Sequence, residues 1–125
     1  MSKDIDSRDD LLVIVRDFYN LLFQSKELKS FFEDFKDQEV LENHFITLVD
    51  FWDNTLFYSG SYKKNAMKPH IELHQKTPLH SVHFKEWLNL LTQAIDKNFK
   101  GLNAETMKNR ALSIATVMKI KFEID

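Results

Sequence analysis

The chain has 125 residues, a net charge of −2 and no cysteine. The absence of cysteine excludes disulfides, zinc–thiolate sites, iron–sulfur clusters and thiol nucleophiles, and the balanced charge gives no electrostatic basis for binding nucleic acid. A chain of this length is predicted to form one domain, spanning residues 1–125.

The N-terminal residues are acidic, where a secretion signal would carry positive charge followed by an apolar run. No apolar stretch approaches the ~20 residues that are needed to cross a bilayer as a helix. We therefore expect a cytoplasmic protein with no membrane insertion and no nucleic-acid partner.

The composition favours an all-α fold. Only two glycines and two prolines occur in the whole chain, which is too few for the many turns of an all-β domain. By contrast there are eleven phenylalanines, two tryptophans and three tyrosines, and each such side chain can bury ~150–250 Å². This much flat apolar surface predicts either a very dense core or an enclosed flat ligand, with the dense core the commoner case.

A first helix is predicted to follow Ser7, which stands three residues before Asp10 in the pattern of a capping box. Apolar residues at three- and four-residue steps then place Tyr19 on the inward stripe with Val15 and Leu22. A buried phenol without a partner costs ~1–3 kcal/mol. Tyr19 is therefore expected to bond either a backbone carbonyl or a bound ligand.

A second long helix is predicted over residues 38–58, ended by Gly60. It carries His44 on the same apolar face as Leu48, and a lone histidine on such a face is more often structural than functional. Tyr19 and His44 nevertheless form a pair of inward polar groups on separate helices. Two such groups could meet at one point in the core.

Four of the five histidines lie between His70 and His83. Pro69 is tolerated in the first turn of a short helix, which would place His70, Leu73 and His74 on one helical face. Two histidines four residues apart can chelate zinc, but no third ligand stands at a useful spacing. The pattern therefore disfavours a zinc site.

The remaining chain predicts two further helices. One is expected over residues 80–99, with Phe84 and Trp87 on its inner face, and the last is expected to be capped by Asn103. The chain has no glycine-rich phosphate loop, no Gly-x-Ser-x-Gly and no His-Glu-x-x-His. Hydrolase and kinase hypotheses therefore have no support.

Taken in order, these motifs resemble the truncated haemoglobins, most closely those of the third group. Phe18-Tyr19 resembles the paired aromatics of the family's B helix, and Phe32 resembles the phenylalanine that wedges against haem. The residues that resemble the distal helix of group three are His44, Leu48 and Phe51-Trp52.

Two further motifs extend the resemblance over nearly the whole chain. Gly60-Ser-Tyr62 followed by Asn65-Ala66-Met67-x-x-His70-x-x-Leu73 is similar to the family's run that ends in the proximal histidine, with alanine at a position where the family usually has proline. His83-Phe84-x-x-Trp87-Leu88 is similar to the helix that carries the distal tryptophan.

The resemblance implies an all-α, globin-like, two-over-two helical sandwich around haem b. It implies that His70 is the protein's ligand to the haem iron, with His74 as the alternative. Tyr19, His44 and Trp87 would contact a small diatomic ligand on the opposite, distal side. The residues implied to contact the cofactor are Phe32, His44, Leu48, Phe51, His70, Phe84 and Trp87.

Three functional hypotheses follow from this resemblance. The first is binding of O2 or a related diatomic ligand with slow release. The second is a haem-dependent enzyme that carries out nitric oxide dioxygenation or peroxide reduction, and it requires an unidentified external reductase because the chain holds no flavin or nicotinamide domain. The third is a haem-free helical interaction module, which the absence of a Soret absorption band would identify.

Overall fold

The structure, a computed structural model, describes residues 3–60, 62 and 67–124. Its helices, in chain order, are α1 (Arg8–Gln24), the 3-10 helix η1 (Lys29–Lys36), α2 (Gln38–Phe57), α3 (Met67–Lys76), α4 (Ser81–Asn98) and α5 (Leu102–Lys121). In the part of the chain described, the extended backbone pairs only at an isolated bridge between Lys3 and Phe99. The predicted all-α fold class is confirmed.

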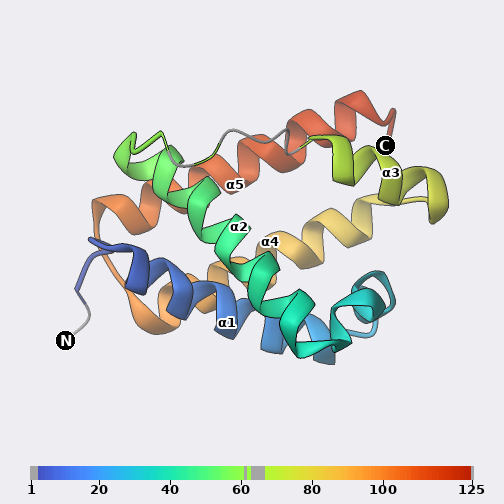
Figure 1. Ribbon diagram of the computed structural model, residues 1–125. Helices are drawn as coiled ribbons and strands as arrows, with labels where there is room; N and C mark the ends of the chain where they lie inside the picture. Colours follow the sequence, from blue (N-terminus) through green and yellow to red (C-terminus); the bar gives the residue numbers. More distant parts are fainter. Residues whose placement is uncertain (1–2, 61, 63–66, 125) are drawn as a thin grey trace.

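The helices are arranged around α1, which packs against α2, α4 and η1, while α4 packs in turn against α5. Figure 1 shows α2 crossing in front of α4 and α5, and α3 at the end of the molecule where the C-terminus also lies. The largest side chains that are fully buried are Ile5, Leu11, Ile14, Leu22, Ile95 and Met107. Among the described residues, no helix is both long enough and apolar enough to span a membrane.

The start of α1 follows the predicted cap in part. Ser7 is the N-cap, and its hydroxyl accepts a hydrogen bond from the backbone N–H of Asp10 at 3.2 Å. The carboxylate of Asp10 does not return the bond to Ser7; it accepts from the backbone N–H of Asp6 at 3.0 Å and pairs with Lys3 at 2.6 Å. The first bond of the capping box therefore forms at Ser7 as predicted, whereas the returning bond goes to Asp6, one residue closer to the N-terminus.

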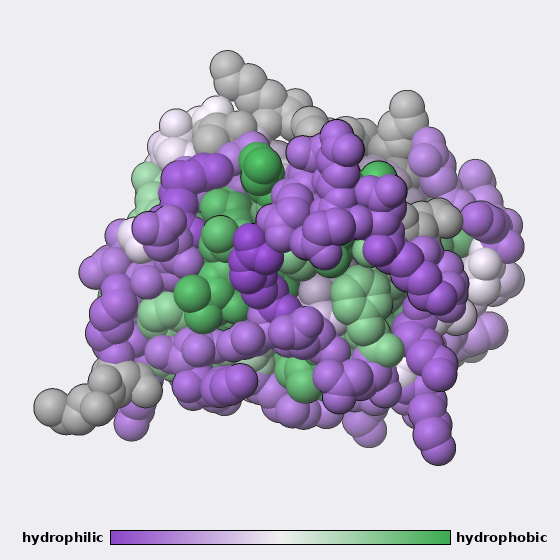
Figure 2. Space-filling model, turned by 60° about the horizontal axis from the view of Figure 1, so that its bottom comes forward, coloured by the Kyte–Doolittle hydropathy of each residue, from purple (hydrophilic) through white to green (hydrophobic). Residues whose placement is uncertain are grey.

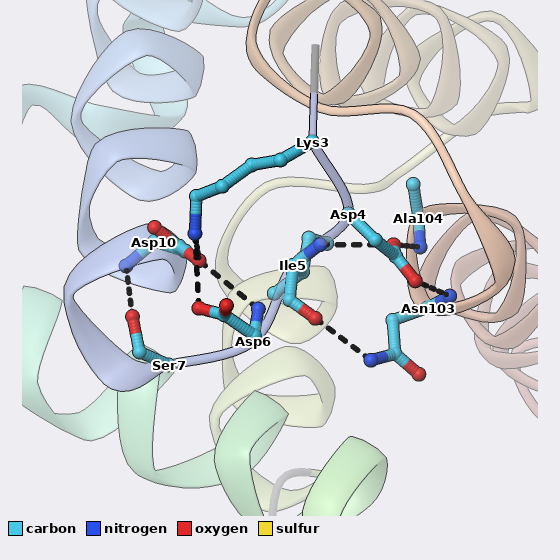
Figure 3. A network of polar contacts seen from close by, with 8 residues as sticks. All are labelled: Lys3, Asp4, Ile5, Asp6, Ser7, Asp10, Asn103 and Ala104. Carbon is cyan, nitrogen blue, oxygen red and sulfur yellow. Dashed lines mark hydrogen bonds and ion pairs between the residues drawn. The ribbon is translucent and has the colours of Figure 1, made fainter.

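The start of α5 is capped from the opposite end of the chain. The prediction that Asn103 caps this helix is wrong, because Asn103 lies inside α5. The carboxylate of Asp4 instead accepts from the backbone N–H groups of Asn103 at 2.9 Å and Ala104 at 3.0 Å, while the side-chain amide of Asn103 donates to the carbonyl of Ile5 at 2.7 Å (Figure 3). These bonds fix the N-terminal segment against α5.

The pKa of Asp4 reflects this position. Burial acts to raise the pKa of the carboxyl, but the hydrogen bonds from the backbone N–H groups of Asn103, Ala104 and Ile5 outweigh it and lower the pKa below its ordinary value. Because the folded-state pKa is lowered, the contribution of this cap to stability is present above the ordinary Asp pKa and is lost as the pH falls through the lowered value.

The end of α2 also differs from the sequence prediction. The helix ends at Phe57, and Tyr58 takes the left-handed conformation that the glycine rule assigned to Gly60. Gly60 still contributes to the helix end, because its backbone N–H donates to the side chain of Asn54 at 2.8 Å. The boundary prediction was therefore off by one residue, and Tyr58 takes a positive φ in addition to Gly60, whose φ is +75°.

We expect Gly101→Ala to lower the free energy of unfolding by ~2–4 kcal/mol, because it combines backbone strain with loss of a helix cap. Gly101 has a φ of +152°, and a Cβ there would lie 2.5 Å from Cγ of Asp4. Gly60→Ala is the matched control: its φ is +75° but a Cβ would meet nothing within 4 Å, so only ~1 kcal/mol is expected. Equal losses of unfolding free energy in Gly101→Ala and Gly60→Ala, measured by urea unfolding, would show that the close approach of Asp4 is not what requires glycine at position 101.

Candidate functional site

Helix α2 presents two apolar rows, each at three- and four-residue steps. The first row is buried in the core and consists of Phe45, Val49, Trp52 and Leu56. The second row lies beside it on the helix, is only half-buried, and consists of Leu41, His44, Leu48 and Phe51. This second row brings three of the predicted pocket residues onto one surface that the core does not cover.

Tyr19 and His44 meet at the centre of this region, as the sequence suggested that they could. The Tyr19 hydroxyl lies 2.6 Å from Nε2 of His44, which joins α1 to α2. Tyr19 is only 5% exposed, and its phenol must therefore be paired inside the protein. The hydrogen bond satisfies Tyr19 and fixes the orientation of the His44 ring.

Both members of this pair are neutral at physiological pH. Burial raises the pKa of the Tyr19 phenol far above its ordinary value. Burial, together with the nearby charge of His70, lowers the pKa of His44 to about 4. The site therefore presents a phenol and a neutral imidazole, with one proton shared along the hydrogen bond between them.

Phenylalanine rings surround the pair on the side of η1. The ring of Phe32, the predicted wedge residue, meets the ring of Tyr19 edge-on at 5.4 Å between centroids. The ring of Phe35 stacks on His44 at 4.3 Å with an interplanar angle of 21°. Phe23 and Phe45 also meet Tyr19 edge-on, at 6.0 and 5.4 Å. These contacts shield the Tyr19 hydroxyl from water and strengthen its hydrogen bond to the half-buried His44.

Helix α4 supplies the remaining predicted pocket residues. Trp87 is half-buried and meets Phe18 edge-on at 6.0 Å, and Phe18 in turn meets the Tyr19 ring at 5.6 Å. Phe84 is 8% exposed and packs in a second core cluster with Leu79 and helix α5. Phe18 therefore links Trp87 to Tyr19, whereas Phe84 belongs to the core between α4 and α5.

The two histidines of α3 have different environments. His70 is half-buried, and its charge acts on His44 across the site. Nδ1 of His74 accepts a hydrogen bond from the backbone N–H of Leu79 at 2.9 Å, and its ring stacks on Phe122 at 4.8 Å. An imidazole that accepts through Nδ1 carries its proton on Nε2, so neither nitrogen of His74 retains a lone pair for a metal.

The described residues contain no group of three or more His, Asp or Glu side chains arranged to hold a metal ion. Among these residues the structure thus gives no support to a chelated zinc site. A single imidazole near a neutral polar pair suits a metal that is already held by a cofactor and needs one ligand from the protein.

An open cavity beside the polar pair indents the surface and has a volume of about 470 Å³. It is lined by Phe23, Lys29, Phe32, Glu33, Phe35, Lys36, Gln38 and Leu41. Figure 2, which views the molecule from the side of α1 and η1, shows apolar surface recessed between hydrophilic side chains near the centre of this face. Only the phenylalanine layer therefore separates Tyr19 and His44 from this cavity.

Sequence analysis missed Phe35 as a member of the site. Its signal was the local density of phenylalanines at positions 31, 32 and 35, but the face that each one presents depends on the 3-10 geometry of η1. The residues Asn65 and Ala66 of the predicted proximal run lie outside the described residues.

We expect Tyr19→Phe to lower the free energy of unfolding by ~1–2 kcal/mol, because it leaves Nε2 of His44 without its partner. A double-mutant cycle with His44→Leu should give a coupling energy of ~1 kcal/mol. Tyr58→Phe is the control, since Tyr58 is 85% exposed and should lose almost nothing. A coupling energy near zero would contradict the hydrogen bond.

Comparison with known proteins agrees with this arrangement. The family model described as bacterial-like globin matches residues 4–122. The fold is also similar to the crystal structure of a group III truncated haemoglobin from Campylobacter jejuni, with a TM-score of 0.87 and 20% sequence identity over 98% of this chain and 95% of that chain. No curated protein sequence matches the chain.

The family match covers nearly the entire chain, including every residue of the candidate site. The structural match at 20% identity shows the shared fold. The predicted resemblance is confirmed at both levels: the chain belongs to the bacterial-like globin family of haem-binding proteins, and it has the fold of a group III truncated haemoglobin.

Proposed function

We propose that the chain binds haem b between the half-buried row of α2 and helix α3, and that it uses this group to bind O2 or a related diatomic ligand. The observation that carries this proposal is the hydrogen-bonded pair of Tyr19 and His44, 2.6 Å apart within a layer of phenylalanine rings. Such a pair offers hydrogen-bonding capacity in an otherwise apolar place, which is what recognition of a small polar ligand requires.

The residues present fit a haem. The side chains of Leu48, Phe51 and Trp87 are apolar yet only half-buried, so they offer flat contact surface for an apolar macrocycle. His70 supplies a single imidazole from α3, and its charge reaches His44 on α2. Leu48 and Phe51 of α2 would contact the apolar macrocycle and His70 of α3 would supply the one protein nitrogen to the iron.

We infer that His70, rather than His74, is the iron ligand. Both nitrogens of His74 are accounted for, because Nδ1 accepts from Leu79 and the proton is therefore on Nε2. A metal-bound histidine instead donates its second ring N–H to a neighbour. His74 serves better as a structural histidine that closes the end of α3 against Phe122.

When bound, haem iron supplies a coordination position for a diatomic ligand such as O2. Tyr19 stays protonated, because burial raises the pKa of its phenol. With His44 donating from Nε2 to the phenol oxygen, the single O–H of Tyr19 would donate a hydrogen bond toward that ligand. His44 orients the phenol, and the indole N–H of Trp87 is a second donor from α4. Phe32, Leu48 and Phe51 would form apolar walls that limit the access of water to the ligand. Phe84 would support the pocket from the core between α4 and α5.

This arrangement favours slow release of a polar diatomic ligand, because a donor in a dry site bonds partial negative charge strongly. We propose O2 as the ligand on this ground. Nitric oxide or peroxide chemistry would use the same donors together with an external reductase.

We expect His70→Ala to lose the axial coordination of reconstituted haem, seen as a change in the ferrous and ferric absorption spectra. His74→Asn is the matched control, because its side-chain oxygen can still accept from the backbone N–H of Leu79, and its spectra should remain those of the wild type. Loss of the axial coordination in His74→Asn but not in His70→Ala would overturn the assignment of His70 as the iron ligand. A wild-type chain that takes up no haem would favour the haem-free interaction module.

We expect Tyr19→Phe to speed the dissociation of O2 from the haem-loaded protein by about tenfold or more, because a hydrogen bond to a charged acceptor contributes ~1.5–3 kcal/mol. Trp87→Phe should have a smaller effect in the same direction. Stopped-flow mixing with a scavenger of O2 measures both rates, with Tyr58→Phe as the control. An unchanged rate in Tyr19→Phe would rule out this residue as the principal donor.

A further inference from the structure

The chain that connects α3 to α4 is held by histidine side chains that accept hydrogen bonds from the backbone. Nδ1 of His83 accepts from the backbone N–H of His80 at 2.9 Å. The backbone N–H of His83 donates to the carbonyl of His80 at 3.0 Å and is shared with the His80 side chain, so the two residues form a reciprocal capping box at the start of α4. Next to this box, His74 accepts from the backbone N–H of Leu79.

A histidine is an unusual choice for these positions. The serine, aspartate and glutamine side chains that normally form a capping box remain hydrogen-bond acceptors throughout the neutral pH range. An imidazole accepts only while one ring nitrogen is unprotonated, and its charge changes between about pH 5 and 8. The positive end of the α4 dipole further disfavours an imidazolium at this place.

The surroundings of the capping box show which charges act on it. Burial and the neighbouring His80 lower the pKa of His83, whereas the carboxylate of Glu27, which precedes η1, acts to raise it, and the net direction is downward. The edge of the Phe31 ring covers His83 at 4.8 Å. On α4 itself, Glu86 is engaged with Asn89 at 3.3 Å.

On the side of α3, the charged and titratable groups are in the last turn, which holds His74 and Lys76. This same corner attaches α3 to the rest of the molecule. Leu79 is buried with Phe84, and Leu73 of α3 packs against their cluster. A change in the capping box therefore affects α3, because α3 packs against the rest of the molecule at this corner.

We propose that His80 and His83 form an acid-sensitive joint, in which the neutral rings cap α4 and their protonation opens the α3–α4 connection. The joint is a property of the chain itself. Its consequence for haem, a weaker hold on the helix that carries His70, rests on the proposed function.

The direction of the pH dependence follows from linkage. Protonation removes the acceptor atoms, so the open form binds protons more readily than the closed form. The stability of the closed joint is therefore fully present above the ordinary histidine pKa of about 6.5. It is lost as the pH falls through the lowered pKa of His83 in the folded protein.

The test is amide hydrogen exchange at Leu79, His80 and His83, expressed as protection factors so that the intrinsic pH dependence of exchange is removed. In the wild type, haem-free and haem-loaded, we expect protection at all three amides to fall about tenfold between pH 7.5 and pH 5, as expected for loss of two capping bonds. The variant His80→Ser/His83→Gln keeps both acceptors of the capping box without titrating in this range, so its protection at residues 80 and 83 should stay constant.

His80→Ala/His83→Ala is the matched control, and it should be poorly protected at both pH values. Equal losses of protection in the wild type and in His80→Ser/His83→Gln would overturn the joint. Loss at His80 and His83 with Leu79 still protected would overturn its coupling to α3. Because the haem-free protein shows the effect by itself, failure of haem binding leaves this test intact.

A measurement on the wild type alone guards against variants that do not fold. Nuclear magnetic resonance titration of the ring protons should give His83 a pKa below that of histidine in the unfolded chain. A value at or above the unfolded one would contradict the proposal.

Discussion

The hydrogen bond between Tyr19 and His44 is the constraint on which the rest of the site depends. Tyr19 is 5% exposed and cannot be left unpaired without a large desolvation cost. Its partner lies on another helix, so the bond fixes the relative position of α1 and α2 at one point. The rings of Phe32 and Phe35 then pack around this point and keep it dry. The need to pair the buried Tyr19 hydroxyl thereby determines where these aromatic rings pack.

Helix α2 carries two adjacent apolar rows that differ in how deeply they are buried. The row of Phe45, Val49, Trp52 and Leu56 is buried and holds α2 in the core. The adjoining row of His44, Leu48 and Phe51 stays half-buried, so it remains available to a flat apolar group. In the proposed haem site, one set of side chains stabilises the fold while the other would contact the cofactor.

Periodicity and composition were enough to predict an all-α fold and an inward Tyr19 and His44, because both follow from apolar spacing along a helix. They could not predict that Asp4 caps α5, since that bond joins residues 99 positions apart. They also could not separate His70 from His74, which share one helical face. That distinction came from a backbone N–H at Leu79, whose direction depends on the α3–α4 connection. Long-range partners of polar groups are set by tertiary structure and leave no local pattern.

The central proposal is that His70 alone binds the haem iron while His44 stays hydrogen-bonded to Tyr19. Resonance Raman spectroscopy of the ferrous, ligand-free, haem-loaded protein tests both parts together. The account predicts one iron–imidazole stretching band and a five-coordinate iron in the wild type, with the band lost in His70→Ala. A six-coordinate spectrum in the wild type that becomes five-coordinate in His44→Leu would show His44 on the iron, and it would contradict the account.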